Sequence, residues 1–351
     1  MDLFFDSIIL LALLGSAMLA QTFLRDRKQR GTWEARHKKT ALTIAVFLLL
    51  GFATIFWGSF IEPRILTIKR VSLDLPNYTP KKPVRVALIS DVHVGTYKKS
   101  GWLKRVSKRV TELQPDLVLI AGDLIVNRPE HAQYLSALST LAARFPTYAV
   151  LGDHDYQVDK QHGQWSINTE TAKTVAKQLE QAGIRVMTNE AVSIKLNNAS
   201  FWLLGLDDWL ARKTNAQRAF AQTDGQGPLV VLVHNPDFIL DPDSRRADFI
   251  VSGNTHGGQI RLPWIGPIPS LPSKLPRIYD EGLFEEPRYS SLVPKAFGTS
   301  EESPAFYKVR DPSATPQNDA VRQLFITSGI SESGPRARLF NPPEIALLEL
   351  Y

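Results

Sequence analysis

Acidic and histidine side chains recur directly after short apolar segments of this chain. The stretch VALISDVHVG, residues 86–95, places Asp91 and His93 two residues apart after such a segment. Alternation of side chains along a strand would send both to the same side, where they could bind one cation. By itself this pair is weak evidence for a site, because Asp and His are common where strands end.

Four later segments have the same design. Segments that begin at residues 117, 148, 229 and 248 are LVLIAGD, YAVLGDHD, LVVLVHNPD and DFIVSGNTHGG. Each is an apolar run followed by an oxygen or nitrogen donor, which is typical of a buried strand that ends at a polar edge. Strands whose carboxyl ends carry polar residues meet at one crevice. The sequence therefore predicts a single site built from five strand ends.

The candidate donors at this site are carboxylates and imidazoles. They are Asp91, His93, Asp123, Asp153, His234 and His256. This set suits Mn²⁺, Fe, Zn²⁺ or Co, and several carboxylates can hold two ions that share one of them. Two ions about 3.5 to 4 Å apart are suited to phosphoester hydrolysis by a metal-bridging hydroxide. The chain has no cysteine, which excludes thiolate chemistry, disulfides and cysteine zinc sites.

The elements that must position these donors alternate between strand and helix. Helical spacing is found at residues 101–113 and 169–182. Further strands are predicted at 65–75, 184–187, 201–206 and 345–350. Asp207 and Asp208 follow the third of these and are interpreted as turn residues, with lining of the cleft as the alternative. This order favours an α/β domain. We assign it to residues 83–351, with a loop insertion rich in Pro, Ser and charge at about 286–321.

Two uncharged apolar segments, residues 7–24 and 41–61, precede the domain. Each is long enough to cross a bilayer, whose hydrocarbon core is spanned by about 20 apolar residues. A signal peptide is the alternative for the first segment, but Asp2 and Asp6 stand where a basic flank is expected. We therefore expect two transmembrane helices in a membrane anchor, residues 1–61, followed by a linker with the first strand, 62–82.

Basic residues crowd the loop between the two apolar segments. Residues 25–40 contain seven Lys or Arg, whereas none precedes the first segment. Because basic loops stay cytoplasmic, we expect a multi-pass protein of the cytoplasmic (inner) membrane with a periplasmic or extracellular domain. Basic residues at 64–82 compete with this orientation. The rest of the chain, 83–351, has equal numbers of acidic and basic residues, so no nucleic-acid partner is expected.

The order of these motifs resembles that of the calcineurin-like metallophosphoesterases. The motifs are Asp91-x-His93, Gly122-Asp123, Gly152-Asp153-His154-Asp155, His234 and Gly253-Asn254-x-His256. The phrases HNPD at 234–237, THGGQIRLP at 255–263, LPSKLPRIYDEGL at 271–283 and FNPPEIALLEL at 340–350 resemble the membrane-associated bacterial branch. The resemblance covers most of 64–351. It implies a four-layer α/β/β/α sandwich that hydrolyses a phosphomonoester or phosphodiester.

The resemblance also implies roles for individual residues. A first metal would be held by Asp91, His93 and His256. A second would be held by Asp153, His234 and Asn254, and Asp123 would bridge the two. His154 would stand beside the metals and bind phosphate or protonate the leaving oxygen. Asp155 would either orient His154 or cap a loop.

Two positions depart from the family pattern, and both belong to the second metal. Asp153 stands where the family usually has Asn, and Asn254 where it usually has His. The exchange adds a negative charge and removes a nitrogen donor, so Mn²⁺ or Mg²⁺ is favoured over Zn²⁺. We expect two divalent ions, with Mn²⁺ the best fit and Fe, Mg²⁺ and Zn²⁺ as alternatives. The competing hypothesis is a one-metal or non-catalytic relative that binds metal or a phosphorylated ligand.

A Pro-rich loop with Trp264, Ile265, Ile268 and Leu271 follows the last predicted ligand. Local packing is the simpler interpretation of these apolar residues. The alternative is an apolar lip that receives an acyl chain, because the domain is tethered to the bilayer. In that case the phosphoester substrate would be lipid-linked.

Overall fold

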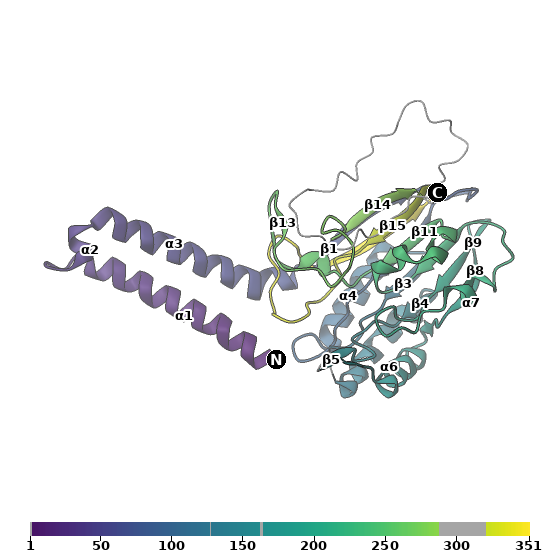
Figure 1. Cartoon of the computed structure of the whole chain (residues 1–351), viewed down its shortest axis with the longest axis horizontal. Helices are drawn as coiled ribbons and strands as arrows, with labels where there is room; N and C mark the ends of the chain where they lie inside the picture. Colours follow the sequence, from purple (N-terminus) through teal and green to yellow (C-terminus); the bar gives the residue numbers. More distant parts are fainter. Residues whose placement is uncertain (1, 127, 162–163, 288–320) are drawn as a thin grey trace, which may run out of the picture.

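The computed structural model describes residues 2–126, 128–161, 164–287 and 321–351 of the chain. A helical hairpin and a two-sheet domain follow one another along the long axis of the molecule (Figure 1). Most of the predicted insertion at 286–321 lies outside the described residues.

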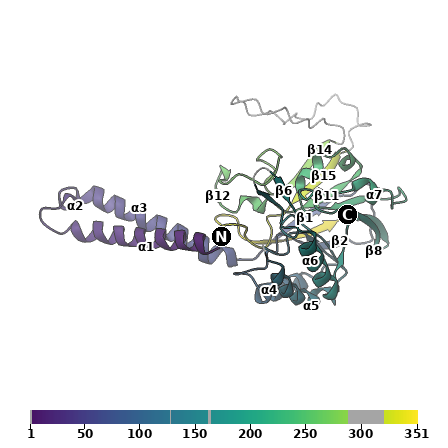
Figure 2. The same cartoon turned by 60° about the horizontal axis from the view of Figure 1, so that its bottom comes forward.

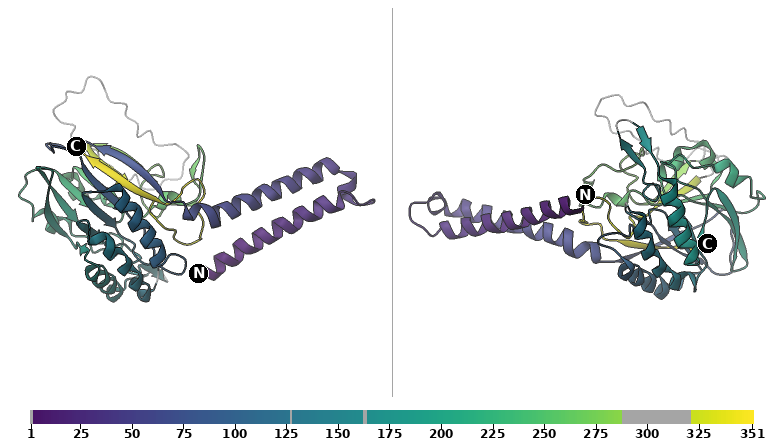
Figure 3. Two further views of the ribbon diagram at one scale, coloured as in Figure 1. Left: turned by 180° about the vertical axis from the view of Figure 1, so that it is seen from behind. Right: turned by 90° about the horizontal axis from the view of Figure 1, so that it is seen from below.

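The hairpin consists of two long antiparallel helices. They are α1 (Asp2–Asp26) and α3 (Lys38–Phe56), joined through the short α2 (Trp33–Arg36). Both are long and apolar enough to cross a membrane, and large apolar side chains such as Leu11 and Phe47 are exposed on them. The turns η1 (Trp57–Ile61) and η2 (Glu62–Arg64) then lead into the domain. Figures 2 and 3 show the hairpin projecting from one end of the domain in every view.

The first sheet has six strands, and most of them are parallel. Their order is β1 (Thr67–Leu73), β16 (Glu344–Leu350), β2 (Val84–Ile89), β3 (Leu117–Ala121), β4 (Thr147–Val150) and β7 (Arg185–Val186). Strands β2, β3 and β4 run parallel, with Ile89 opposite Ile120 and Ala121 opposite Val150. Their carboxyl ends therefore lie at one edge.

The second sheet also has six strands. Their order is β14 (Gly282–Pro287), β15 (Val321–Ile326), β11 (Phe249–Ser252), β10 (Leu229–Leu232), β9 (Ala199–Gly205) and β8 (Glu190–Leu196). Strands β9, β10 and β11 are parallel. The remaining strands form two small antiparallel ribbons. They are β5 (Asp159–Gln161) with β6 (Gln164–Ser166), and β12 (Arg261–Leu262) with β13 (Gly266–Pro267).

The two sheets pack face to face across a shared apolar core. Leu88 of the first sheet and Phe201 and Phe325 of the second belong to it. The outer face of the first sheet packs on α4 (Ser100–Leu113), η3 (Pro129–Leu138), α5 (Ser139–Ala142) and α6 (Thr169–Gln181). The outer face of the second packs on α7 (Ala216–Phe220) and η4 (Pro236–Leu240). Ser244 of η5 (Pro242–Arg246) accepts a hydrogen bond from Arg322 of β15. Because both faces of each sheet are covered, the central strands are continuous apolar runs. The predicted α/β class is confirmed.

Candidate metal centre

Backbone hydrogen bonds join the loops that follow the predicted strand ends. The amide of Asp91 donates to Gly122 O at 3.1 Å, and the amide of His93 donates to Asp123 O at 2.9 Å. Across the second sheet, the amide of Gly253 donates to His234 O at 3.0 Å. Because His234 Nε2 also lies 3.2 Å from Asp123 Oδ2, the predicted donors of the two sheets meet at one place.

Several candidate ligands have a left-handed backbone. The φ angles of Asp91, His93 and Asp123 are 52°, 41° and 55°, and those of Asn254 and His256 are 70° and 52°. Strand alternation was therefore the wrong reason to expect Asp91 and His93 on one side, because β2 ends at Ile89. Uncommon backbone conformations of this kind cluster at functional sites, where the surrounding structure holds them.

Glycines before the acidic ligands allow the loops to approach closely. A Cβ atom on Gly152 would lie 2.2 Å from Asp123 Oδ1, and one on Gly122 would lie 2.8 Å from the ring of His234. No side chain fits at such distances. The glycine that precedes an aspartate in two of the five motifs is thus required by packing at the site.

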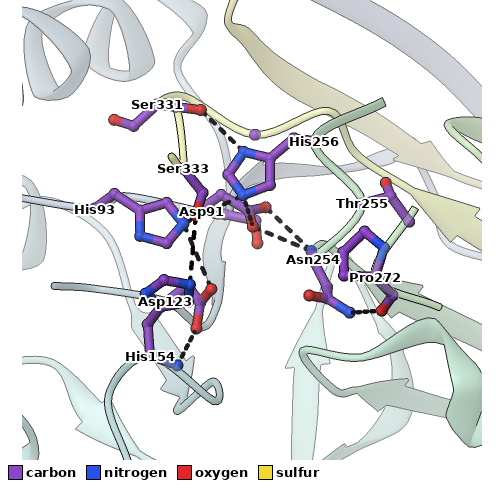
Figure 4. Close-up of polar contacts among 12 residues, drawn as sticks. Asp91, His93, Asp123, His154, Asn254, Thr255, His256, Pro272, Ser331 and Ser333 are labelled. Carbon is purple, nitrogen blue, oxygen red and sulfur yellow. Dashed lines mark hydrogen bonds and ion pairs between the residues drawn. The ribbon is translucent and has the colours of Figure 1, made fainter. Parts of the chain in front are cut away.

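The first group of donors consists of Asp91, His93 and His256, all buried. The Nε2 atoms of His93 and His256 lie 3.2 Å apart, and His256 Nε2 lies 3.3 Å from Asp91 Oδ1. His93 Nε2 is also 3.4 Å from Asp123 Oδ2. Figure 4 shows these side chains converging on one point.

The second group extends from the same Asp123 oxygen. His234 Nε2 lies 3.2 Å from Asp123 Oδ2 and 3.5 Å from Asp153 Oδ1. Asp123 Oδ2 therefore lies between an imidazole of the first group and one of the second. This is the position that a bridging carboxylate would occupy.

The donor arrangement fits divalent cations. Ligand atoms that share one ion with bonds of about 2.0 to 2.2 Å lie about 3 Å from each other, close to the separations here. Within the described residues, the buried Nε2 of His234 and Oδ1 of Asp153 make no hydrogen bond. Buried polar atoms without partners are costly unless a cation or water satisfies them.

Backbone carbonyls fix which imidazole nitrogen faces the centre. His234 Nδ1 lies 2.6 Å from Ala121 O, and His256 Nδ1 lies 3.1 Å from Ser331 O. A carbonyl only accepts hydrogen bonds, so the proton of each neutral ring is on Nδ1. The lone pair on Nε2 then faces the other donors, as metal ligation requires.

Burial lowers the pKa values of the histidines, whereas nearby carboxylates raise them. Burial lowers the pKa of His93 well below its ordinary value and lowers that of His256 to about 3. At His234 burial also opposes the charge, but Asp123 outweighs it and raises the pKa well above the ordinary range. The cluster thus holds negative charge that a cation would neutralise in place of the His234 proton.

His154 stands at the edge of the cluster. Its Nδ1 lies 2.8 Å from Val126 O and its Nε2 lies 3.4 Å from Ser333 Oγ. Its backbone N–H donates to Asp123 Oδ1 at 3.0 Å. Burial opposes protonation of the ring, but the nearby Asp123 and Asp153 raise the pKa of His154 above its ordinary value. The ring is therefore suited to donate a proton.

Asp155 is a loop-capping residue. Its Oδ1 accepts from the amides of Leu124 and Ile125 at 2.9 and 3.2 Å, and its Oδ2 accepts from Gly152 at 2.9 Å. These bonds tie the loop after β3 to the loop after β4. Of the two roles considered for Asp155, the contacts favour capping.

Asn254 is buried beside Asp91. Its backbone N–H donates to Asp91 Oδ1 at 3.1 Å, and its Nδ2 donates to Pro272 O at 3.0 Å. Figure 4 shows the amide oxygen on the side away from Pro272. This orientation leaves Oδ1 as the side-chain atom that could ligate a cation.

Asp208 is a candidate functional residue for which the sequence favoured a turn role over lining of the cleft. Its Oδ1 accepts from the amide of Ala211 at 2.5 Å, which is a turn contact. It is fully buried, and its Oδ2 has no hydrogen bond within the described residues. Burial, followed by Asp153, raises the pKa of Asp208 well above its ordinary value. The sequence carries a signal for a site role of Asp208, because FWLLGLDD is another apolar run with a glycine that ends in acidic residues.

A pocket of about 170 Å³ opens beside His93 and His154. Its other lining residues include Tyr97, Lys98, Glu332, Ser333 and Arg336. The ammonium of Lys98 donates to Ile330 O and Glu332 Oε1, both at 2.9 Å. Cations beside a candidate metal centre suit an anionic substrate.

A two-sheet α/β fold with a carboxylate- and imidazole-lined centre at its strand ends defines a metal-dependent phosphoesterase. Residues 84–258 match the family model of the calcineurin-like phosphoesterases. The chain belongs to this family, whose members use divalent metals, and it is a hydrolase that acts on phosphoester bonds.

Three bacterial proteins are examples of the relatives to which the chain is similar. UDP-2,3-diacylglucosamine pyrophosphatase LpxG of Chlamydia trachomatis is 28% identical over 294 residues, which cover 72% of this chain and 88% of that protein. An uncharacterized metallophosphoesterase of Helicobacter pylori strain J99 is 28% identical over 89% of this chain and 71% of its own length. Phosphodiesterase YaeI of Escherichia coli is 30% identical over 52% of this chain and 64% of its own length.

Proposed function

We propose that this protein is a membrane-anchored phosphoesterase with two divalent metal ions, acting on an amphiphilic phosphoester at the membrane surface. The observation that carries the proposal is the position of Asp123 Oδ2, 3.4 Å from His93 Nε2 and 3.2 Å from His234 Nε2. A single carboxylate oxygen between two imidazoles is the arrangement expected of a binuclear site.

The proposed ligands fall into two sets that share Asp123. The first set is Asp91, His93 and His256, and the second is Asp153, His234 and Asn254. Bound divalent ions would supply Lewis acidity toward the phosphoryl oxygens and toward the attacking water. The carboxylate-rich second set favours Mn²⁺ or Mg²⁺ over Zn²⁺.

The chain's own residues would then bind the substrate and manage its charge. His154 would donate the proton on Nε2 to a phosphoryl or leaving oxygen, because its Nδ1 is held at Val126 O. Lys98 and Arg336 line the adjoining pocket and would attract the anionic group. Stabilisation of developing negative charge is the main catalytic contribution of such donors.

The position of the pocket supports an amphiphilic substrate. The hydroxyl of Tyr97 donates to Asp6 Oδ2 at 2.6 Å, and Arg336 Nη2 lies 3.6 Å from Asp6 Oδ1. The pocket wall thus contacts the first turns of α1, and the pocket would open near a bilayer crossed by the hairpin. The name of the Chlamydia relative describes a substrate with two acyl chains on a nucleotide-linked sugar.

The test uses the full chain purified in detergent and stripped of metal. We expect hydrolysis of bis-p-nitrophenyl phosphate or p-nitrophenyl phosphate to return with Mn²⁺, and a nucleotide-linked diacyl sugar to be cleaved more efficiently. Metal analysis should give two equivalents of Mn²⁺ per chain. One equivalent at saturation would contradict the binuclear centre. A preference for water-soluble esters over every acylated substrate would contradict the amphiphilic substrate.

A further inference from the structure

Large apolar side chains are exposed together around β12 and β13. We call them the apolar loop patch; they are Leu262, Trp264, Ile265, Ile268, Ile278 and Phe340. Trp264 is fully exposed, and Ile265 and Phe340 are 68% and 59% exposed. Local packing therefore does not account for the loop after the last predicted ligand. An exposed cluster of this kind marks a surface that binds a partner or a membrane.

The backbone of the loop presents the two aromatic rings outward. Trp264 and Phe340 have φ angles of 64° and 54°, a left-handed conformation that bulky residues rarely adopt. Leu262, Trp264, Ile265, Ile278 and Phe340 line one groove together with Arg261, Arg277 and Asp280. Arg261 Nη1 is paired with Asp280 Oδ2 at 2.6 Å. Aromatic and aliphatic residues flanked by arginine are the composition of a segment that lies at a membrane interface.

The patch is joined directly to the end of the hairpin. The amide of Arg338 donates to Gly58 O at 2.8 Å, and the amide of Asn341 donates to Glu62 Oε1 at 2.6 Å. Phe340 lies between these two attachment points in the sequence. The patch residue is therefore held within a few residues of the end of α3.

The same segment also holds the loop that carries Trp264. The amide of Leu339 donates to Gln259 O at 3.0 Å, and the amide of Arg261 donates to Leu339 O at 2.9 Å. The segment 338–341 is thus bonded to the hairpin end on one side and to the β12–β13 loop on the other. These contacts fix the height of the patch relative to the apolar helices.

Three views place the loop with β12 and β13 level with the end of the hairpin that adjoins the domain. In Figure 1 the loop with β13 lies near the point along the long axis where α1 begins. In Figure 2 β12 is again close to the N-terminus, and Figure 3 agrees from behind. Trp57, at the start of the turn that ends the hairpin, is 47% exposed. Tryptophans are enriched at the level of the lipid headgroups.

We propose that the apolar loop patch inserts into the lipid headgroup and upper acyl region of the bilayer that the hairpin crosses. The proposal rests on the membrane anchoring of the proposed function. The patch is a second, interfacial contact that fixes the orientation of the domain on the hairpin. It would hold the pocket of His93 and His154 close to the membrane surface.

The experiment uses the absence of cysteine from the chain. Single cysteines at Trp264→Cys, Phe47→Cys and Asn198→Cys are labelled with an environment-sensitive fluorophore in the full chain, reconstituted into phosphatidylcholine–phosphatidylglycerol nanodiscs. Phe47 lies within α3, and Asn198 is exposed in the turn between β8 and β9. Quenching is measured with iodide in the water and with spin labels on the acyl chains.

We expect the probe at residue 264 to lose iodide quenching and to be quenched by shallow acyl-chain spin labels. The Phe47→Cys probe should be quenched by deep labels, and the Asn198→Cys probe by iodide alone. If only the Phe47→Cys probe is quenched by lipid, the patch proposal is wrong and the anchor stands. If neither is, anchoring itself fails. A probe at residue 264 that is shielded from iodide but not quenched by lipid would indicate a second copy of the chain, which also overturns the proposal.

Discussion

Asp123 is the residue on which the site depends most. One of its oxygens faces two imidazoles, and the other accepts the backbone N–H of His154 at 3.0 Å. The carboxylate thus contacts both proposed metal positions and the loop that carries the proposed acid. Its two oxygens have different partners. Replacing either oxygen with the NH₂ group of an amide would remove a hydrogen-bond acceptor.

Asp123→Asn should abolish hydrolysis and reduce bound Mn²⁺ to one equivalent or fewer, because the shared negative charge is lost. Metal analysis and turnover of bis-p-nitrophenyl phosphate measure the two effects. Asp159→Asn, in the small β5–β6 ribbon, serves as the matched control. Full activity in Asp123→Asn would refute a bridging role.

The double variant Asp153→Asn with Asn254→His restores the ligand types usual in the family. It removes a carboxylate and adds a nitrogen, so the preferred ion should shift from Mn²⁺ toward Zn²⁺. The measurement is the ratio of kcat/KM with each ion in metal-stripped protein. An unchanged ratio would show that these two side chains do not select the ion.

Lys98 should make substrate binding pH-dependent. Burial lowers the pKa of Lys98 to about 8 from its ordinary 10.5, against the opposing effect of Glu332. The folded chain loses this proton first, so KM for an anionic substrate should rise as pH passes about 8. Between pH 8 and 10.5 Lys98 is protonated in the unfolded chain but not in the folded chain. The destabilisation of the fold by the buried charge should therefore fade as pH rises through this window.

Two variants check this expectation. Lys98→Met should have a raised KM that is flat across pH 8, whereas Lys99→Met, at an exposed position, should keep the wild-type profile. The profiles are measured with a substrate whose own phosphate does not titrate in this range. The same rise in Lys98→Met as in the wild type would assign the titration to another group.

At the scale of elements, the segment between β15 and β16 supports the candidate ligands. The guanidinium of Arg338 is fully buried and donates to Ser331 O, the carbonyl that also contacts His256 Nδ1. Asn341 Nδ2 donates to His256 O at 2.7 Å. The segment 338–341, which is attached to the hairpin, therefore also orients the candidate ligand His256.

Asn341→Ala should weaken metal binding without removing a ligand. Loss of a contact that orients a ligand lowers metal affinity by about 10- to 100-fold. The Mn²⁺ concentration for half-maximal activity measures this change, and kcat at saturating Mn²⁺ should recover. A fall in kcat that saturating metal does not rescue would indicate a different role.

Leu348→Ala tests the core between the sheets. Leu348 lies in β16, which pairs with β1 and β2, and it is buried against the second sheet. Truncation of a buried leucine lowers the free energy of unfolding by about 2 to 5 kcal/mol. Denaturant unfolding of the full chain in detergent measures it. Leu262→Ala, which is exposed, should change this free energy far less.

At the scale of the whole molecule, a hairpin that crosses a membrane, as in the proposed anchor, would have both of its ends on the same side. The basic loop that joins α1 to α3 would then lie on the other side. The domain and its pocket would share the side of Asp2 and Arg64. The positive charge of residues 25–40 predicts that this side is the periplasm or the cell exterior.

Gln29→Cys and Asn198→Cys should therefore react differently in intact cells. A membrane-impermeant maleimide should label residue 198 without lysis and residue 29 only after lysis. The reverse pattern would place the domain in the cytoplasm. In that case the basic residues at 64–82 would have determined the orientation.

The sequence by itself determined the α/β class, the apolar helices and the strand ends where the donors lie. These follow from local patterns: apolar runs that both form and bury a strand, and about 20 uncharged residues in a row. The ligand types were likewise legible, because the chemistry of carboxylates and imidazoles does not depend on where they are placed.

Only the tertiary structure decided how these parts meet. The left-handed backbone at Asp91 and His93, the burial of Asp208, the support of His256 by Asn341 and the exposure of Trp264 all depend on segments far apart in the chain. Local sequence patterns carry no information on which distant segments touch. Packing of the two sheets, the hairpin end and the segment 338–341 sets those contacts, and with them the geometry of the candidate metal centre and its proposed height above the membrane.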